Sequence, residues 1–222
     1  MAARFICIAL LILTCGGSPL LAAETGTSNM VIAKYDDSDN NLRQKKQEAT
    51  RRLLINESYE YYEIDGSNID ELRQQMKQRG TKWNDGKVYA ALTTWDIGYD
   101  YDVSSADGKY FIKSADTKIG IVFHLPRRQG NASNSEQLVG QWDKYMEHLK
   151  EHEFGHRDLA VKAAGEINEI LASLGSFSSR SELDKEATRL VKAKLKAMKE
   201  IQVKYDADTH HGIKQGAVLS SL

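Results

Sequence analysis

The chain has 222 residues, of which 41% are hydrophobic and 27% are charged, and its formal net charge is −1 at pH 7. This length favours a single domain with a sizeable core, and the composition is ordinary for a globular protein. The near-zero net charge argues against a protein that binds nucleic acid or an anionic membrane through a global positive field.

The first residues have the pattern of a secretory signal peptide. Arg4 precedes an apolar run from Phe5 to Leu13, and an Ala-rich stretch follows up to Ala23. A short basic start, an apolar run too short to span a bilayer comfortably and a small-residue exit are typical of a cleaved leader. We therefore expect residues 1–23 to be a signal peptide, and the protein to be periplasmic or secreted with no transmembrane helix in the mature chain.

Both cysteines of the chain, Cys7 and Cys15, lie within this leader. The mature chain is therefore expected to have no disulfide and no thiol chemistry. An alternative interpretation makes Cys15 the acylated residue of a lipoprotein, which would anchor the protein to a membrane, although Thr14 is a poor fit before such a cysteine.

The signals after the leader are weak at first and then sharpen. Residues 24–57 are polar, with a possible strand over Met30–Tyr35 and a possible loosely held helix around Leu42–Leu54. Tyr59–Ile64 is rich in strand formers and stops at the turn signal Asp65-Gly66. We predict the first clear strand there.

A short amphipathic helix is predicted next. Ser67 can cap its N-terminus, and the chain reaches Gly80 at its end. The residues expected to face inward are Ile69, Leu72 and Met76.

Alternating apolar and polar residues then predict a small, largely antiparallel sheet. A first strand is expected within Val88–Val103, followed by a loop over Ser104–Gly108 and a second strand pair that ends at Pro126. On the polar face of the first strand stand Asp96, Asp100 and Asp102. A calcium site there is less favoured than a hydrated strand face, because no loop wraps the carboxylates around one point.

The C-terminal half predicts a helical hairpin. Ser135 is a good N-cap for a long helix that runs to Gly175, and a second helix begins at Leu183 and continues to Tyr205. A short connection should make the two helices pack antiparallel, with Asp206–Gly212 as a loop. The expected fold class is α+β, with the sheet packed against this hairpin.

The first of these helices contains one H-E-x-x-H pattern, His152-Glu153-Phe154-Gly155-His156. On a helix the two histidines lie about one turn apart on one face, so their nitrogens can converge on one zinc ion. Glu153 is then placed to take a proton from a water bound by the zinc. Both histidines fall on the buried apolar stripe of the helix, whereas an accidental match would most often lie on the solvated face.

A catalytic zinc needs a third protein ligand. A third histidine further along the same helix is excluded, because the matching position is Lys162. His148, one turn before the motif, could line the site, and His124 at the end of a strand stays open. Glu166 and Glu169 are too far along the helix.

Pairing the two helices brings Tyr205 level with Glu151, so the segment that contains His210 and His211 should emerge beside the motif. One of these histidines can bind zinc, while the other, or Tyr205, donates a hydrogen bond to the oxyanion of the transition state.

Several segments together also resemble a known bacterial family. They are Tyr62-Glu63-Ile64-Asp65-Gly66 leading into Glu71-Leu72-Arg73, Trp95, the H-E-x-x-H stretch, and Tyr205-Asp206-Ala207-Asp208-Thr209-His210-His211-Gly212. With the signal peptide, they are similar to the bacterial "domain of unknown function 922" family of predicted secreted zinc-dependent proteases, from about Tyr59 to the end of the chain. The closing pattern of that family, Y-D-x-x-T-x-H-G, aligns its histidine with His211. The resemblance implies a single zincin-like domain over residues 24–222, with zinc held by His152, His156 and His211.

The expected function is that of an exported zinc metallopeptidase, acting on a peptide or protein with Glu153 as general base. One alternative is a zinc amidase that acts on cell-wall peptides through the same site. Another is a non-catalytic assembly or inhibitory module of the envelope, in which Glu153 has no catalytic role.

Overall fold

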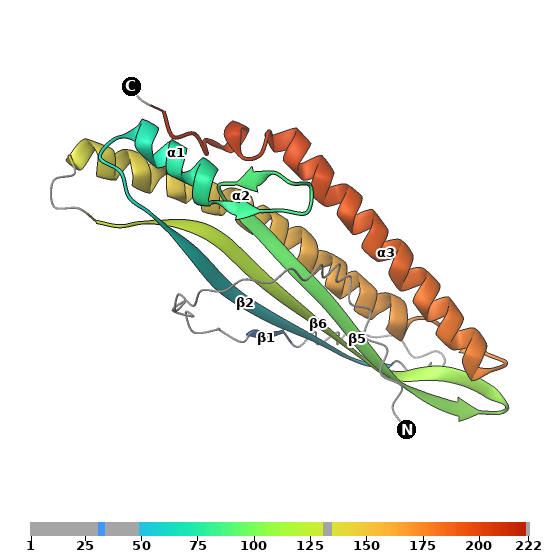
Figure 1. The fold of residues 1–222 in the computed structure, drawn as a ribbon. Coiled ribbons are helices and arrows are strands. Elements are labelled where there is room, and N and C mark those ends of the chain that lie inside the picture. Colours follow the sequence, from blue (N-terminus) through green and yellow to red (C-terminus); the bar gives the residue numbers. More distant parts are fainter. Residues whose placement is uncertain (1–30, 34–48, 131–134, 221–222) are drawn as a thin grey trace, which may run out of the picture.

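The computed structural model describes residues 31–33, 49–130 and 135–220, and it shows a mixed sheet with two long helices on one face (Figure 1). The strands are β1 Val31–Ala33, β2 Thr50–Ile64, β3 Thr81–Lys82, β4 Val88–Tyr89, β5 Leu92–Ala106, β6 Lys109–Arg128 and β7 Ser176–Phe177. The helices are α1 Ile69–Arg79, α2 Glu136–Ala172, α3 Arg180–Thr209 and the 3-10 turn η1 Ile213–Gln215. The predicted leader lies outside the described residues.

The sheet is mixed, so the prediction of a largely antiparallel sheet is wrong in part. Its strand order is β1-β2-β6-β5, with β7 also paired to β6. β2 runs parallel to β6 from Thr50↔Ser114 to Ile64↔Arg128, whereas β5 joins β6 as an antiparallel hairpin. A parallel pair needs a long connection, and here α1 and the β3–β4 hairpin lead from β2 into β5, which runs back along the sheet and turns into β6. Side-chain alternation is the same in parallel and antiparallel strands, so it could not reveal the direction of β2.

β6 forms the centre of the sheet and contributes most of its core. Buried side chains recur at every second position from Ala115 to Leu125. They are Ala115, Thr117, Ile119, Ile121, Phe123 and Leu125; Ile112, beyond a register irregularity, and Pro126 are buried as well. The strand continues to Arg128, past the end predicted at Pro126. Proline has no backbone N–H to donate to a neighbouring strand. β5 begins opposite His124, so no β5 residue is paired with Pro126. Asp96, Asp100 and Asp102 are exposed, as expected for a hydrated strand face.

Two predictions for the N-terminal half change. The helix expected around Leu42–Leu54 is wrong for residues 50–54, which belong to β2; residues 42–48 lie outside the described part. The predicted strand over residues 30–35 is confirmed for β1. The N-cap of α1 is Asn68 and not Ser67, because Asn68 Oδ1 accepts from the Glu71 backbone N–H at 3.0 Å while Glu71 Oε2 accepts from the Ser67 N–H at 2.8 Å. The predicted inward face of α1 is confirmed as Ile69, Leu72 and Met76.

The C-terminal helices form the predicted antiparallel hairpin. Ser135 caps α2, its Oγ accepting from the Leu138 N–H at 3.2 Å. α2 packs across β2, β6 and β5, and α3 packs mainly on α2. The prediction of a loop over Asp206–Gly212 is wrong for residues 206–209, because α3 continues to Thr209, whose hydroxyl donates to the Tyr205 carbonyl at 2.7 Å. Residues 210–212 form a turn, as expected.

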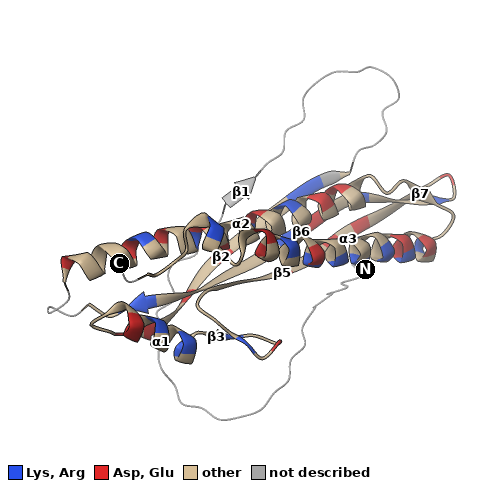
Figure 2. Cartoon of the chain, turned by 90° about the horizontal axis from the view of Figure 1, so that it is seen from above, with Lys and Arg blue, Asp and Glu red and all other residues tan. Residues whose placement is uncertain are grey.

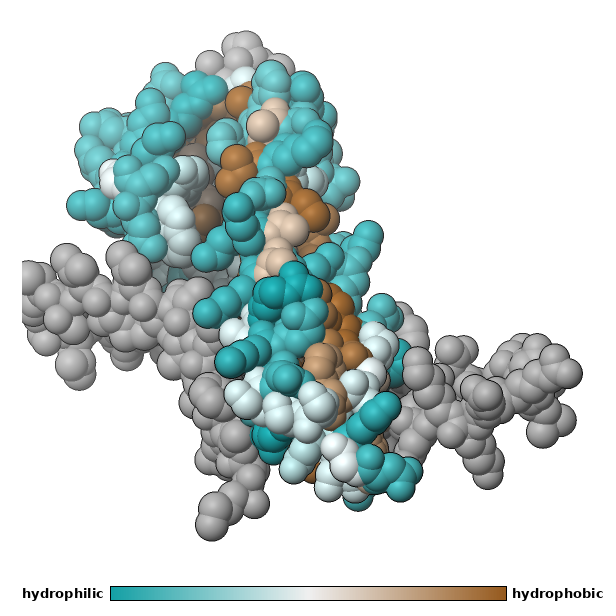
Figure 3. Space-filling model, turned by 90° about the vertical axis from the view of Figure 1, so that its right-hand side faces the viewer, coloured by the Kyte–Doolittle hydropathy of each residue, from teal (hydrophilic) through white to brown (hydrophobic). Residues whose placement is uncertain are grey.

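The exposed faces of this hairpin are charged. Acidic and basic residues are interspersed along both helices (Figure 2). Viewed from the end at which β5 turns into β6, the described surface is mainly hydrophilic, with hydrophobic side chains in a narrow band (Figure 3). Among the described residues, no helix is both long and apolar enough to cross a membrane.

A substitution at Phe123 tests whether the face of β6 toward α2 belongs to the hydrophobic core. It is fully buried, with its ring centroid 5.0 Å from that of Tyr59 and 5.3 Å from that of Phe154. Phe123→Ala should lower the free energy of unfolding by about 3–5 kcal/mol, because the cavity would be enclosed on all sides. Denaturant unfolding measures this loss, with Val122→Ala on the opposite face as the matched control. An equal loss in both variants would contradict this assignment.

Candidate metal centre

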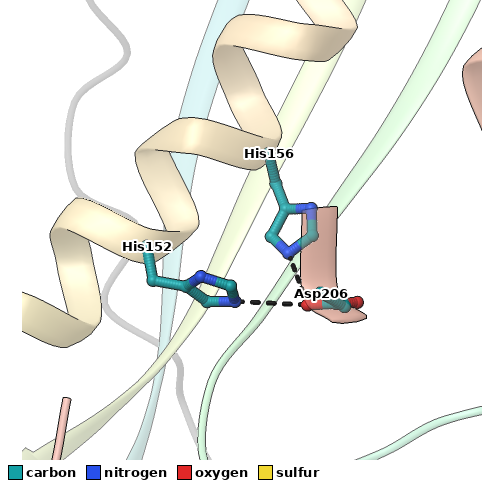
Figure 4. Close-up of side chains that lie close together, drawn as sticks. All are labelled: His152, His156 and Asp206. Atoms are coloured by element: carbon teal, nitrogen blue, oxygen red, sulfur yellow. Dashed lines mark hydrogen bonds and ion pairs between the residues drawn. The ribbon is translucent and has the colours of Figure 1, made fainter. Parts of the chain in front are cut away.

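Three side chains from the helical hairpin point toward one another: His152 and His156 from α2, and Asp206 from α3 (Figure 4). Asp206 Oδ1 lies 3.2 Å from His152 Nε2 and 3.0 Å from His156 Nε2. The three possible ligand atoms lie within 4.8 Å of one another. Two imidazole nitrogens and a carboxylate oxygen are a frequent set of zinc ligands.

The outer nitrogen of His156 is a hydrogen-bond donor. Gln202 donates its Nε2 to the His156 backbone carbonyl at 3.0 Å, and a carbonyl can only accept. The oxygen of the same amide, Oε1, must then face His156 Nδ1, at 2.5 Å. Nδ1 therefore carries the proton, and in the neutral ring Nε2 has a free lone pair directed at Asp206.

His152 is held in the same way through one more residue. Tyr205 Oη donates to the His152 carbonyl at 3.2 Å, so it accepts from Gln215 Nε2 at 3.1 Å. Gln215 Oε1 then accepts from His152 Nδ1 at 2.9 Å. Again Nε2 is left to face Asp206. Metal-binding histidines typically make such an outer hydrogen bond, which fixes the ring and the tautomer.

Two lone pairs and a carboxylate oxygen therefore face one another, an arrangement that repels unless a cation or protons lie between them. Burial opposes a charge on His156, but its hydrogen bonds to Asp206 and Gln202 together raise its pKa. Burial also opposes the charge of Asp206, yet the hydrogen bonds from both histidines hold its pKa well below the usual range. The donor set thus fits a divalent cation.

Glu153 lies beside this cluster. It is 4% exposed, and its Oε2 accepts a hydrogen bond from Thr93 Oγ1 at 2.6 Å. Burial raises the pKa of the Glu153 carboxyl, against the opposing effects of Thr93 and the two histidines. A carboxylate in this setting is a stronger base than one in water.

The triad and Glu153 line one cleft of about 920 Å³. Its walls come from α2, α3, the first residues of β5 and the segment that contains β3 and β4. Other residues on the cleft wall include Trp83, Tyr89, Trp95, Lys199 and Val203. A second hollow, of about 890 Å³, is lined by other residues of α2 and by none of the triad.

The structure places the other sequence candidates around this centre. His211 lies at the rim, with its side chain 65% exposed and its Nδ1 3.3 Å from Asp206 Oδ1. His210 is the C-cap of α3. His124 contacts Glu60 and Thr94 and not the triad, and His148 lies 3.5 Å from Glu151.

Asp206 is the residue that sequence reasoning missed. The prediction ended the helix at Tyr205, which placed Asp206 in a loop of undefined direction. Gln202 and Asp206 are four residues apart, so both lie on one helix face once α3 is extended. The signal in the sequence that could have indicated Asp206 was a second polar residue four positions after Gln202, on the same face of an extended helix.

Zinc content distinguishes the two possible third ligands. For a centre that binds zinc through the triad, Asp206→Ala should reduce bound zinc to little or none relative to the parent, because two histidines alone leave the metal too few protein ligands. Asp208→Ala, an exposed carboxylate on the same helix, is the matched control. His211→Ala should keep its zinc; loss of zinc there, with retention in Asp206→Ala, would instead support the ligand set implied by the resemblance. Elemental analysis gives the readout.

Comparison with known families yields one match. The family model described as "Bacterial protein of unknown function (DUF922)" matches residues 59–212. No curated protein and no solved structure matches the chain. The matched region includes the whole triad, Glu153 and His211, and covers more than half of the chain. The chain therefore belongs to the DUF922 family of bacterial proteins.

Proposed function

We propose that this protein is a zinc-dependent peptidase, zincin-like in its use of H-E-x-x-H, that acts in the cell envelope or outside the cell. The observation that carries the proposal is a buried carboxylate, Glu153, beside two imidazoles that converge with Asp206 on one open cleft. General base and metal ligands in this sequence order are the arrangement used by H-E-x-x-H peptidases.

His152, His156 and Asp206 would hold the zinc, and His211 is the alternative to Asp206 as third ligand. When bound, zinc polarises the scissile carbonyl and lowers the pKa of the attacking water. Gln202 and Gln215 keep both Nε2 atoms directed at the metal position.

Glu153 accepts the proton of the attacking water and passes it to the leaving amine. Its burial raises its pKa, which makes the carboxylate basic enough for the first transfer and its acid acidic enough for the second. The hydrogen bond from Thr93 fixes which carboxylate oxygen faces the cleft.

The free edge of β5 supports binding of an extended peptide. β5 ends the strand order in the described sheet, and Leu92–Trp95 line the cleft. A peptide that adds to this edge gains backbone hydrogen bonds regardless of its sequence, while its side chains meet the cleft walls. This favours a peptide substrate, and the amidase alternative differs only in which peptide is bound.

Glu153→Gln is the decisive variant. It should retain zinc but lose about 10²–10⁴-fold in kcat/KM on a peptide library, because it removes the base and leaves the ligands. Glu151→Gln, an exposed neighbour on α2, is the matched control and should remain active. Unchanged cleavage by Glu153→Gln would contradict the mechanism; cleavage confined to cell-wall peptides would identify the amidase instead.

Thr93→Val should change the pH dependence of that activity. The Thr93 hydrogen bond lowers the pKa of Glu153, so its loss raises that pKa further. The base acts only when deprotonated, so the acidic limb of the kcat/KM profile should move to higher pH. Thr94→Val, whose hydroxyl contacts His124, should leave the limb in place. A shift toward lower pH would contradict the assignment of Glu153 as base.

A further inference from the structure

The chain after α3 turns back and packs against α2 as a strap, residues Gly212–Ser220 (Figure 1). The reversal uses three consecutive residues in the left-handed region, His210 and His211 at φ 52° and Gly212 at φ 82°. At the far end Gln141 of α2 donates to the Ser220 carbonyl at 3.3 Å, and Leu219 is 4% exposed. Both ends of the strap are therefore tied to α2.

The strap backbone lies directly against two histidines of α2. A Cβ on Gly212 would come within 3.1 Å of His152 Cγ, and one on Gly216 within 3.0 Å of His148 Cδ2. Both glycines have positive φ, so the close approach and the backbone conformation require glycine for two separate reasons. Gln215 sits between them, and its amide is thereby delivered to His152.

The hydrogen bonds of Gln215 belong to a network in which each donor and acceptor is fixed. It runs from the acceptor-only carbonyl of His152 through Tyr205 Oη and Gln215 Nε2, and returns from Gln215 Oε1 to His152 Nδ1. Thr209 Oγ1, at 3.5 Å from the same nitrogen, donates to a carbonyl and is likewise an acceptor toward the ring. Every neighbour of Nδ1 thus requires it to be the protonated nitrogen.

Gly155, inside the H-E-x-x-H motif, makes room for the Tyr205 side chain of this network. A Cβ at Gly155 would collide with the Tyr205 hydroxyl, so the missing side chain makes room for it. The Tyr205 ring then lies parallel to that of His152, with 5.1 Å between centroids, and edge-on to that of His156 at 4.9 Å. Tyr205 thus packs against both imidazoles, and its hydroxyl is committed to His152 and Gln215.

We propose that the strap is a positioning element of the metal centre: Gln215, supported by Tyr205, holds His152 in the tautomer whose Nε2 faces Asp206. Gln202 does the same for His156 from within α3. Gln215 lies beyond the region that the family model matches, which ends at residue 212. The proposal rests on the metal binding required by the proposed function, but not on peptidase activity.

Zinc affinity, measured by competition with a chromophoric chelator, tests the role of Gln215. Gln215→Leu removes the acceptor and should weaken zinc binding about 10–100-fold, the usual effect of losing an outer partner of a metal-bound histidine. Gln215→Glu keeps an acceptor for the Nδ1 proton and should restore most of the affinity. Gln141→Leu, which removes another glutamine contact of the strap without touching His152, should bind zinc like the parent.

The ring tautomer gives a readout that general loosening of the strap would not produce. In the metal-free protein, long-range nitrogen–proton correlation spectra should show His152 protonated on Nδ1 in the parent and in Gln141→Leu. Gln215→Leu should lose that preference, with an unfolding midpoint close to that of Gln141→Leu.

The outcomes separate this inference from the proposed function. Equal zinc affinity in Gln215→Leu and the parent, or an unchanged His152 tautomer, would overturn the positioning role alone. Failure of Gln215→Glu to recover affinity would also overturn it. A parent protein that binds no zinc would overturn both the positioning role and the peptidase.

Discussion

The packing of α2 across the sheet is the constraint on which the site depends. Over most of its length α2 buries apolar side chains against β6, but at His152 and Glu153 the same stripe buries polar ones, each 4% exposed. Buried polar groups are costly unless they are paired. The partners come from three neighbouring segments: Thr93 from β5, Asp206 from α3 and Gln215 from the strap. These polar contacts therefore link β5, α3 and the strap to one turn of α2.

The direction of these hydrogen bonds decides the electrostatics. Each amide that holds a histidine is itself oriented by a backbone carbonyl, which can only accept. The outer nitrogens must then donate, so in the neutral rings the inner nitrogens are left as acceptors that face the Asp206 carboxylate. A divalent cation relieves this arrangement because it can bind both nitrogens and the carboxylate oxygen at once. The fold therefore prepares a centre of negative potential at a position reached from the cleft.

The proposed peptidase activity requires the metal centre, the base and the substrate to meet in one place. The proposed metal ligands, the proposed general base and the edge of β5 come from three elements, α2, α3 and β5, and all border one cleft. Rigid elements carry each of them, so little has to move to bring substrate, water and base together. Trp83, Trp95 and Val203 form apolar parts of the cleft wall, where side chains of a bound peptide would lie.

Local signals in the sequence determined a good deal of this protein. The cap at Ser135, the inner face of α1, the alternation of β6 and the antiparallel pairing that brings Tyr205 beside His152 all follow from short-range patterns. So does the location of the centre, because the H-E-x-x-H pattern falls on the buried stripe of one helix. Only the tertiary structure decided that β2 runs parallel to β6, that α3 continues to Thr209 and brings Asp206 to the histidines, and that Gln215 returns to hold one of them. The reason is physical: periodicity records which face of an element is buried, whereas strand direction, helix ends and hydrogen-bond partners depend on what other segments supply.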